Sequence, residues 1–254
     1  MSRLIKSLSF ENLSFHYEGQ EPLLKNINFV FPVFNSRSGQ DKVSHSQTID
    51  RRRTASRQAE IVVIRSTLGS GSSTLLQILA GLQIPTSGSY LLNGIPVEKM
   101  SFEEFLPFRL RIGYGFGMGG LISNRTLFEN LILPLNYHKI CSQQEAANLV
   151  LTLMDRFELI KYKDLRIAYV SPSHRKITVL IRAVIMKPEV LLLDDPNIRV
   201  STEIQQMYAE LLREQINNGN LHTIFITSFD ESFFSYFNYT SIYIAGTKIT
   251  TAPI

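Results

Sequence analysis

The amino-acid sequence predicts an α/β fold in a single domain, residues 1–254. Strand-like and helix-like runs alternate along the chain, an order typical of strands joined by crossover helices. Apolar residues make up 44% of the 254 positions, enough to bury a large core. A glycine-rich loop, LGSGSST at 68–74, joins an expected strand to an apolar helix.

The first part of the chain predicts a β-rich region followed by this loop. The expected strands are 7–16, 24–31, 61–65 and the hairpin strand 89–94. Tyr17 lies in the turn between the first two strands. The helix after the loop is expected to end at Gly81, with Pro85 and Gly88 behind it.

The rest of the chain predicts a helical region followed by further α/β units. Residues 125–170 are expected to be mostly helical, because apolar residues from Leu149 to Phe157 fall on one helix face. The later expected elements are helix 175–187, strand 189–194, helix 202–217, strand 222–228 and the terminal strands 239–246 and 247–251.

The net charge of +4 is concentrated in residues 35–58. This stretch carries six cations and two anions, so the remainder of the chain is neutral overall. A basic face running through the fold is therefore not indicated, and nucleic acid is not an expected partner. We expect 35–58 to be an extended, flexible insertion, either a solvated loop or a contact for anionic lipid or a partner through Arg51, Arg52 and Arg53.

The sequence also indicates where in the cell the protein is expected. The longest apolar runs, such as 190–193, are too short to span a bilayer. The N-terminus lacks the apolar core of a signal peptide, which predicts a cytosolic location. The lone Cys141 excludes an internal disulfide and gives no indication of a metal cluster.

Taken in order, four segments resemble the ATP-binding cassette (ABC) subunit of a membrane transporter. They are the loop with the helix behind it (68–94), the Q-loop region (112–135), the signature position (170–176) and the Walker B strand (187–196). The resemblance covers the chain except 35–58, and 119–135 is most similar to the branch serving Mce-linked lipid trafficking. It implies a P-loop NTPase-like fold with a mixed central sheet, an antiparallel β subdomain and a helical subdomain at about 115–170.

The resemblance also implies ATP and Mg²⁺ as cofactors. The residues it assigns to ATP are Tyr17, Gly69, Ser70, Gly71, Ser72, Ser73 and Thr74. Ser73 and Asp194 would hold Mg²⁺, and Asp195 stands in the place of the catalytic glutamate. Simpler structural roles stay open: a helix cap for the loop, a strand-end turn for Asp194 and Asp195, and an ordinary core or turn position for Tyr17.

The sequence departs from the family pattern at most positions that serve hydrolysis. The substituted positions are Ser66, Ser72, Gly117, Pro172, Ser173, Asp195, Ser201 and Phe229. Ser72 replaces the lysine that neutralises phosphate, and Gly117 replaces the glutamine that links Mg²⁺ and the attacking water to the membrane subunit. A carboxylate one methylene shorter, as in Asp195, is a poorer general base for an attacking water.

We therefore expect a cytosolic subunit on the inner face of the cell membrane, with impaired or absent hydrolysis. It would act by docking beneath an integral membrane permease and by pairing with a second cassette, identical or different. One alternative is a slow ATPase in which Arg65 supplies the missing positive charge. The other is a soluble nucleotide-sensing module without a permease.

Overall fold

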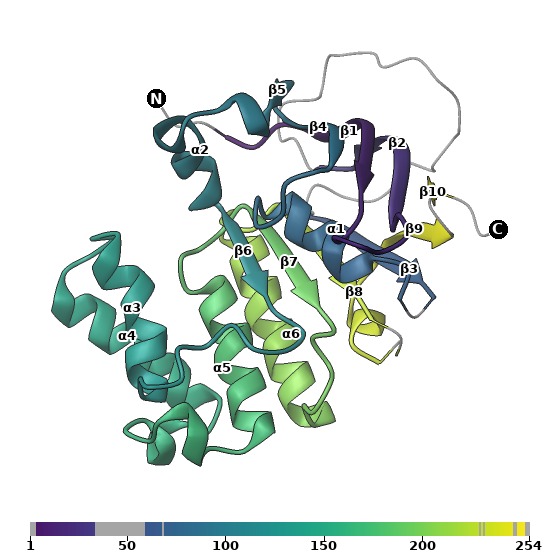
Figure 1. Cartoon of the computed structure of the whole chain (residues 1–254). Helices are drawn as coiled ribbons and strands as arrows, with labels where there is room; N and C mark the ends of the chain where they lie inside the picture. The colour runs from purple at the N-terminus through teal and green to yellow at the C-terminus, as the bar shows by residue number, and fades with distance from the viewer. Residues whose placement is uncertain are drawn as a thin grey trace.

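The computed structural model describes residues 4–33, 59–67, 69–228, 230, 232–245 and 248–251. Two sheets and a set of helices form the α/β arrangement that the sequence predicts (Figure 1). The expected insertion at 35–58 lies outside the described residues, so its predicted role stays a prediction.

The smaller sheet is antiparallel and has the strand order β2-β1-β4-β5. Its strands are β1 (Leu8–Phe15), β2 (Leu24–Phe31), β4 (Ser87–Leu92) and β5 (Ile95–Pro96). Side chains alternate between the faces of each strand, and the apolar set of β1 is buried. The antiparallel β subdomain is therefore present as expected.

The larger sheet has the order β10-β9-β3-β8-β7-β6, and its neighbours run parallel except for the β9–β10 pair. Its strands are β3 (Glu60–Ser66), β6 (Ile112–Gly115), β7 (Val190–Asp194), β8 (Thr223–Thr227), β9 (Thr240–Ala245) and β10 (Lys248–Thr250). The carboxyl ends of β3, β8 and β7 consequently lie at one edge of this mixed sheet, beside the loop that follows β3.

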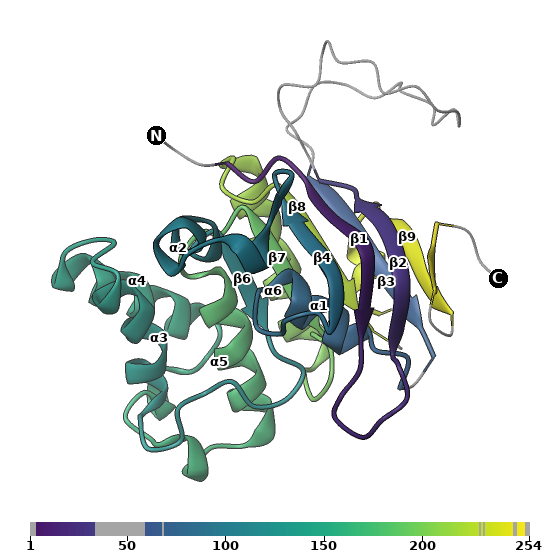
Figure 2. The ribbon, with the colours of Figure 1, turned by 45° about the horizontal axis from the view of Figure 1, so that its top comes forward.

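Six α-helices complete the described fold. They are α1 (Ser72–Leu79), α2 (Phe102–Arg109), α3 (Leu127–Tyr137), α4 (Gln143–Arg156), α5 (Pro172–Val184) and α6 (Thr202–Asn217). Figures 1 and 2 both place α3 and α4 at the end of the molecule away from β1 and β2. Among the described residues, no helix combines the length and the apolar character needed to cross a bilayer.

The two faces of the central sheet belong to two different cores. In β3, Val62 and Ile64 pack in the cluster that contains α1 and the small sheet. Ile61 and Val63 face the other cluster, which contains α3, α4, α5 and α6. Because both faces are covered, the strand is a continuous apolar run rather than an alternating one.

Some boundaries differ from the sequence prediction. Helix α5 begins at Pro172 and ends at Val184, whereas the expected helix was 175–187. Ser171 accepts a hydrogen bond from the N–H of His174 (3.2 Å), and proline is favourable at the first helical position because its missing N–H would have no helical partner there. Helix α2 and strand β6 were not predicted as elements; α2 begins with a capping box between Ser101 and Glu104.

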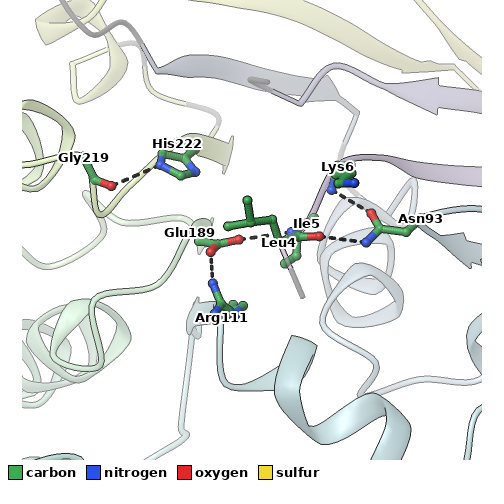
Figure 3. A network of polar contacts seen from close by, with 8 residues as sticks. All are labelled: Leu4, Ile5, Lys6, Asn93, Arg111, Glu189, Gly219 and His222. Atoms are coloured by element: carbon green, nitrogen blue, oxygen red, sulfur yellow. Dashed lines mark hydrogen bonds and ion pairs between the residues drawn. The ribbon is translucent and has the colours of Figure 1, made fainter. Parts of the chain in front are cut away.

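A polar network fastens residues 4–6, just before β1, to the amino edge of the central sheet and to Asn93 (Figure 3). The buried carboxylate of Glu189 accepts a hydrogen bond from the N–H of Ile5 (3.1 Å) and forms an ion pair with Arg111. The Asn93 side chain donates to the carbonyl of Leu4 (2.7 Å) and accepts from the N–H of Lys6 (2.6 Å). These contacts hold the segment that leads into β1 next to the start of β7.

Candidate functional site

The loop between β3 and α1 has the backbone shape of a phosphate cradle. Gly69 and Gly71 have φ values of 78° and 87°, in the left-handed region that glycine adopts without steric cost. Leu75 donates to the carbonyl of Gly71 (2.8 Å), so α1 starts directly at the loop. Among the described residues no side chain caps α1, which leaves the N–H groups of its first turn to an anionic ligand.

The side chains at this helix start fit a phosphate group. Ser72, Ser73 and Thr74 form the first turn of α1, as the sequence predicts. The hydroxyl oxygen of Ser70 is buried and has no hydrogen-bond partner among the described residues. A buried hydroxyl without a partner is costly, and a phosphate oxygen would satisfy it. Leu68, within the loop, lies outside the described residues.

Ser73 and Asp194 meet at the carboxyl edge of the central sheet. The Ser73 hydroxyl donates to Oδ1 of Asp194 (3.0 Å), although the two residues lie far apart in the sequence. Thr227, the last residue of β8, donates to the same oxygen (2.8 Å). A hydroxyl beside a carboxylate is a hard oxygen donor set of the kind that Mg²⁺ prefers, so these residues fit the expected cation. Thr227 was missed, although the end of an apolar strand next to β7 could have indicated it.

Asp195 forms the turn that ends β7. Its φ is 44°, its N–H donates to the carbonyl of Thr227 (2.9 Å), and its carbonyl accepts from Ile198 (3.3 Å). Aspartate is among the few non-glycine residues that enter the left-handed region readily. The backbone of Asp195 therefore forms the turn at the end of the strand, one of the two roles left open by the sequence. That its carboxylate acts as a general base stays a prediction.

Tyr17 lies beside the start of α1. Its hydroxyl shares a hydrogen bond with Oγ1 of Thr74 (3.1 Å), and its ring packs edge-on against Phe15 at 5.0 Å. The residue remains 37% exposed, so part of it is accessible to a ligand. Stacking of Tyr17 on adenine stays a prediction, and the ring is in a suitable place for it.

Two of the substituted positions, the signature at 170–176 and Ser201, lie at helix starts that serines cap. Ser171 caps α5, and its hydroxyl also contacts Nδ1 of His174 (3.0 Å). The N–H that Pro172 lacks is one of the donors that this helix start would offer to a phosphate. Ser201 caps α6 by accepting from the N–H of Ile204 (3.5 Å). Phe229, another of the substituted positions, lies outside the described residues.

Lys176 is a second residue that sequence reasoning missed. Its ammonium lies beside the candidate magnesium ligands and donates to the carbonyl of Asp194 (2.9 Å) and to that of Phe116 (2.8 Å). The signal was present in the sequence, because a lysine one helical turn before the buried Leu180 falls on the apolar face of α5.

Arg65 does not fill the place of the missing lysine in this structure. Its guanidinium contacts the hydroxyls of Tyr239 (3.2 Å) and Ser241 (3.4 Å) and lies over the ring of Phe234 at 5.2 Å. These partners lie on β9 and in the segment before it, so the guanidinium extends toward the neighbouring strand. The expectation that Arg65 supplies the charge in the loop has no support from this geometry.

The comparison with known proteins agrees with this geometry. The family model for ABC transporters matches residues 50–197. A probable sulfate/thiosulfate import ATP-binding protein, CysA of Chlorella vulgaris, is 32% identical over 183 residues, covering 71% of this chain and 74% of that protein. The chain belongs to the ABC transporter family.

A second relative is also an ATP-binding protein of a transport system, and a solved structure has the same fold. The lipoprotein-releasing system ATP-binding protein LolD of Buchnera aphidicola is 29% identical over 203 residues, covering 79% of this ABC cassette and 87% of that protein. The dimeric structure of MJ0796, a bacterial ABC transporter cassette, superposes with a TM-score of 0.75 at 22% identity and covers 95% of this chain and 96% of that one. The cassette fold is therefore confirmed.

Cassettes of this family bind ATP, typically with Mg²⁺, and pair with membrane components and with each other. In this cassette the loop N–H groups and Ser70 would hold phosphate, and Ser73 with Asp194 would hold the cation. The bound cation would supply charge neutralisation at the phosphates. Among the described residues there is no cluster of three or more histidine, cysteine or acidic side chains that offers a different metal site.

A groove of about 470 Å³ opens between α2 and β6 on one side and α3 and α5 on the other. Its apolar lining includes Leu106, Leu110, Leu133, Pro134, Tyr137 and Met186. Arg109 and Arg182 also line it; Arg109 donates to the carbonyl of Ile112 (2.9 Å), and Arg182 donates to that of Gly120. Burial lowers the pKa of both guanidinium groups, and within the described part of the chain neither forms an ion pair.

Proposed function

We propose that this chain is the cassette subunit of a membrane transporter in which ATP hydrolysis is impaired, and that its main role is to dock onto a permease. In this proposal it lies peripherally at the cytoplasmic face of the membrane and pairs with a second cassette, identical or different. A lipidic cargo is favoured by the resemblance of 119–135 to the Mce-linked branch and by similarity to a protein named for lipoprotein release.

One contrast supports impaired hydrolysis. The Ser73–Asp194–Thr227 arrangement that would hold Mg²⁺ is formed, with oxygen–oxygen distances of 3.0 and 2.8 Å. Around it, Ser72 provides no cation, Gly117 has no side chain to orient water, and Asp195 lies in a tight turn. Weak binding of nucleotide with little turnover follows from this combination.

Turnover of the purified chain tests the hydrolysis part of the proposal. We expect phosphate release from ATP and Mg²⁺ at the background rate, with the Asp194→Asn variant indistinguishable from the unmodified chain. Positioned bases contribute about 10²- to 10⁴-fold, and the shorter Asp195 stands in the place of the catalytic glutamate. Magnesium-dependent turnover that falls to background in Asp194→Asn would instead establish the slow ATPase. Folding of both chains would be verified by circular dichroism.

The groove supports the docking part. Most of its lining is apolar, and Tyr137, which is 76% exposed, is part of it. Two partly desolvated guanidinium groups line it without carboxylate partners in the described residues. An amphipathic helix with a carboxylate on its apolar face would cover the apolar lining and pair with these charges. We assign this groove to a cytoplasmic helix of the permease.

Charge reversal at Arg109 tests this assignment. In co-sedimentation with inside-out vesicles from the organism's own membrane, we expect Arg109→Glu to weaken binding roughly 10- to 30-fold, since two like charges at a desolvated contact cost about 2 kcal/mol. Lys25→Glu makes the same charge change at an exposed position of β2 and should leave binding unchanged.

Two further vesicle preparations show whether the chain binds a permease or the lipid itself. Protease treatment of the vesicle surface should abolish binding, because it removes the exposed loops of a permease. Equal binding to protein-free vesicles of the same lipids, or equal loss in both charge variants, would mean that the chain is attracted to lipid rather than docked through the groove.

A further inference from the structure

Lys176 connects three parts of the site through one ammonium group. The residue projects from α5 and is only 6% exposed. Its Nζ donates to the carbonyls of Phe116 (2.8 Å), Gly117 (3.4 Å) and Asp194 (2.9 Å). An ammonium has three N–H donors, so these carbonyls use its full capacity. Two of them belong to the segment after β6, and the third ends β7.

The charge of this buried group is balanced by its surroundings. Burial lowers the pKa of Lys176 to about 8, while the negative charges of Asp194 and Asp195 act in the opposite direction. A charge-assisted hydrogen bond is stronger than a neutral one, and in a site of low dielectric it orders the groups that accept it.

Gly117 allows the same segment to approach Asp194 closely. A Cβ at Gly117 would lie 3.0 Å from Oδ2 of Asp194 and 3.2 Å from its Cγ. Cβ atoms in proteins rarely approach other heavy atoms this closely. The backbone after β6 therefore lies directly against the carboxylate whose Oδ1 accepts from Ser73 and Thr227. A side chain at position 117 would require Asp194 or this segment to shift by a few tenths of an ångström.

We infer that Lys176 is a positioning residue that, with Gly117, fastens the segment after β6 and the start of α5 to the end of β7 without help from a nucleotide. Where the family uses a glutamine to link the bound cation to this segment, this chain has a direct connection between protein groups. The inference concerns contacts within the isolated chain, so it goes beyond the proposed function and does not depend on a permease.

A general packing role for the lysine predicts a different result from a local connection. If Lys176 only fills the core, its replacement by an apolar residue of similar length should affect the domain uniformly or very little. If it fastens one segment, its replacement should free that segment and leave distant elements protected.

Hydrogen exchange of the purified chain distinguishes these cases. We use 5 mM ATP and Mg²⁺ as the probe, roughly five thousand times a dissociation constant of about 1 μM. With and without this probe, we expect amides of 116–121 in the unmodified chain to exchange at the same rate. In Lys176→Met we expect these amides to exchange about tenfold faster or more, with α6 and the β1–β2 pair unchanged. Lys176→Gln, which keeps two N–H donors, should give an intermediate rate.

Lys163→Met is the matched control, because that lysine pairs with Asp164 at the surface and its loss should change nothing in 116–121. The inference would be overturned if 116–121 became protected only when ATP and Mg²⁺ were added, or if Lys176→Met left its exchange unchanged. Uniform acceleration across β1, β2 and α6 would also overturn it. Should Lys176→Met fail to fold, the Lys176→Gln rate decides between the same outcomes.

Discussion

Replacing Ser72 with lysine is expected to tighten the binding of ATP and Mg²⁺ by about 10- to 150-fold, corresponding to one charge-assisted contact of about 1.5–3 kcal/mol. Ser72 is the first residue of α1, directly after Gly71, and it is partly exposed, so a longer side chain can extend toward the phosphates. The cradle already offers N–H groups and the hydroxyl of Ser70. Calorimetric titration of both chains measures the difference.

Two companion variants make this result specific. Ser72→Met has a similar length without the charge and should bind no more tightly than the unmodified chain. Ser73→Ala in the lysine background should lose part of the gain, because the hydroxyl beside Asp194 would no longer assist the cation. Equal affinity in the lysine and methionine variants would show that the loop does not hold phosphate in the way described.

Replacing Gly113 with alanine is expected to lower the free energy of unfolding by about 3 kcal/mol, near the upper end of the usual cost of overpacking. A Cβ at this position of β6 would overlap the carbonyl oxygen of Ala183 in α5 and lie 2.9 Å from Cγ of Pro188. Since the obstacle includes backbone, α5 would have to move away from β6. Urea denaturation followed by circular dichroism measures the loss.

Two other glycines serve as graded controls. At Gly115 the nearest obstacle is Cδ2 of Leu193 at 2.9 Å, the end of a flexible side chain, so alanine should cost less there. Gly119 has open space around it but a φ of 77°, so alanine should cost only about 1 kcal/mol of backbone strain. Equal losses at Gly113 and Gly119 would mean that the contact with α5 does not limit this packing.

The sequence predicts the strands and helices well where an apolar pattern is long and has a clear period. Strand 24–31 and helix 202–217 have the predicted boundaries, and β3, the loop and α1 follow one another as expected. Weak local signals explain the misses. β6 has only four residues, two of them glycine, and its place in the sheet depends on β7 beside it.

The site was predictable where it follows from local sequence and less so where it depends on tertiary packing. Ser73 and Asp194 were paired through the family resemblance, and the structure brings them to 3.0 Å. Lys176 was missed because a single lysine on an amphipathic helix is normally read as solvated, and only the backbone carbonyls of two distant segments give it partners. The partners of Arg65 likewise come from β9, far along the chain.

The position of β3 in the central sheet has a consequence for biosynthesis. β3 begins at Glu60, yet its two neighbours are β8, starting at Thr223, and β9, starting at Thr240. Pairing between such distant segments forms late, because a long loop must be closed before its contacts stabilise it. While the ribosome is still making the middle of the chain, β3 has neither neighbour. The loop between β3 and α1 therefore acquires its shape only after β8 and β9 have been made, and a nascent chain released before Thr223 would contain the loop sequence without its fold.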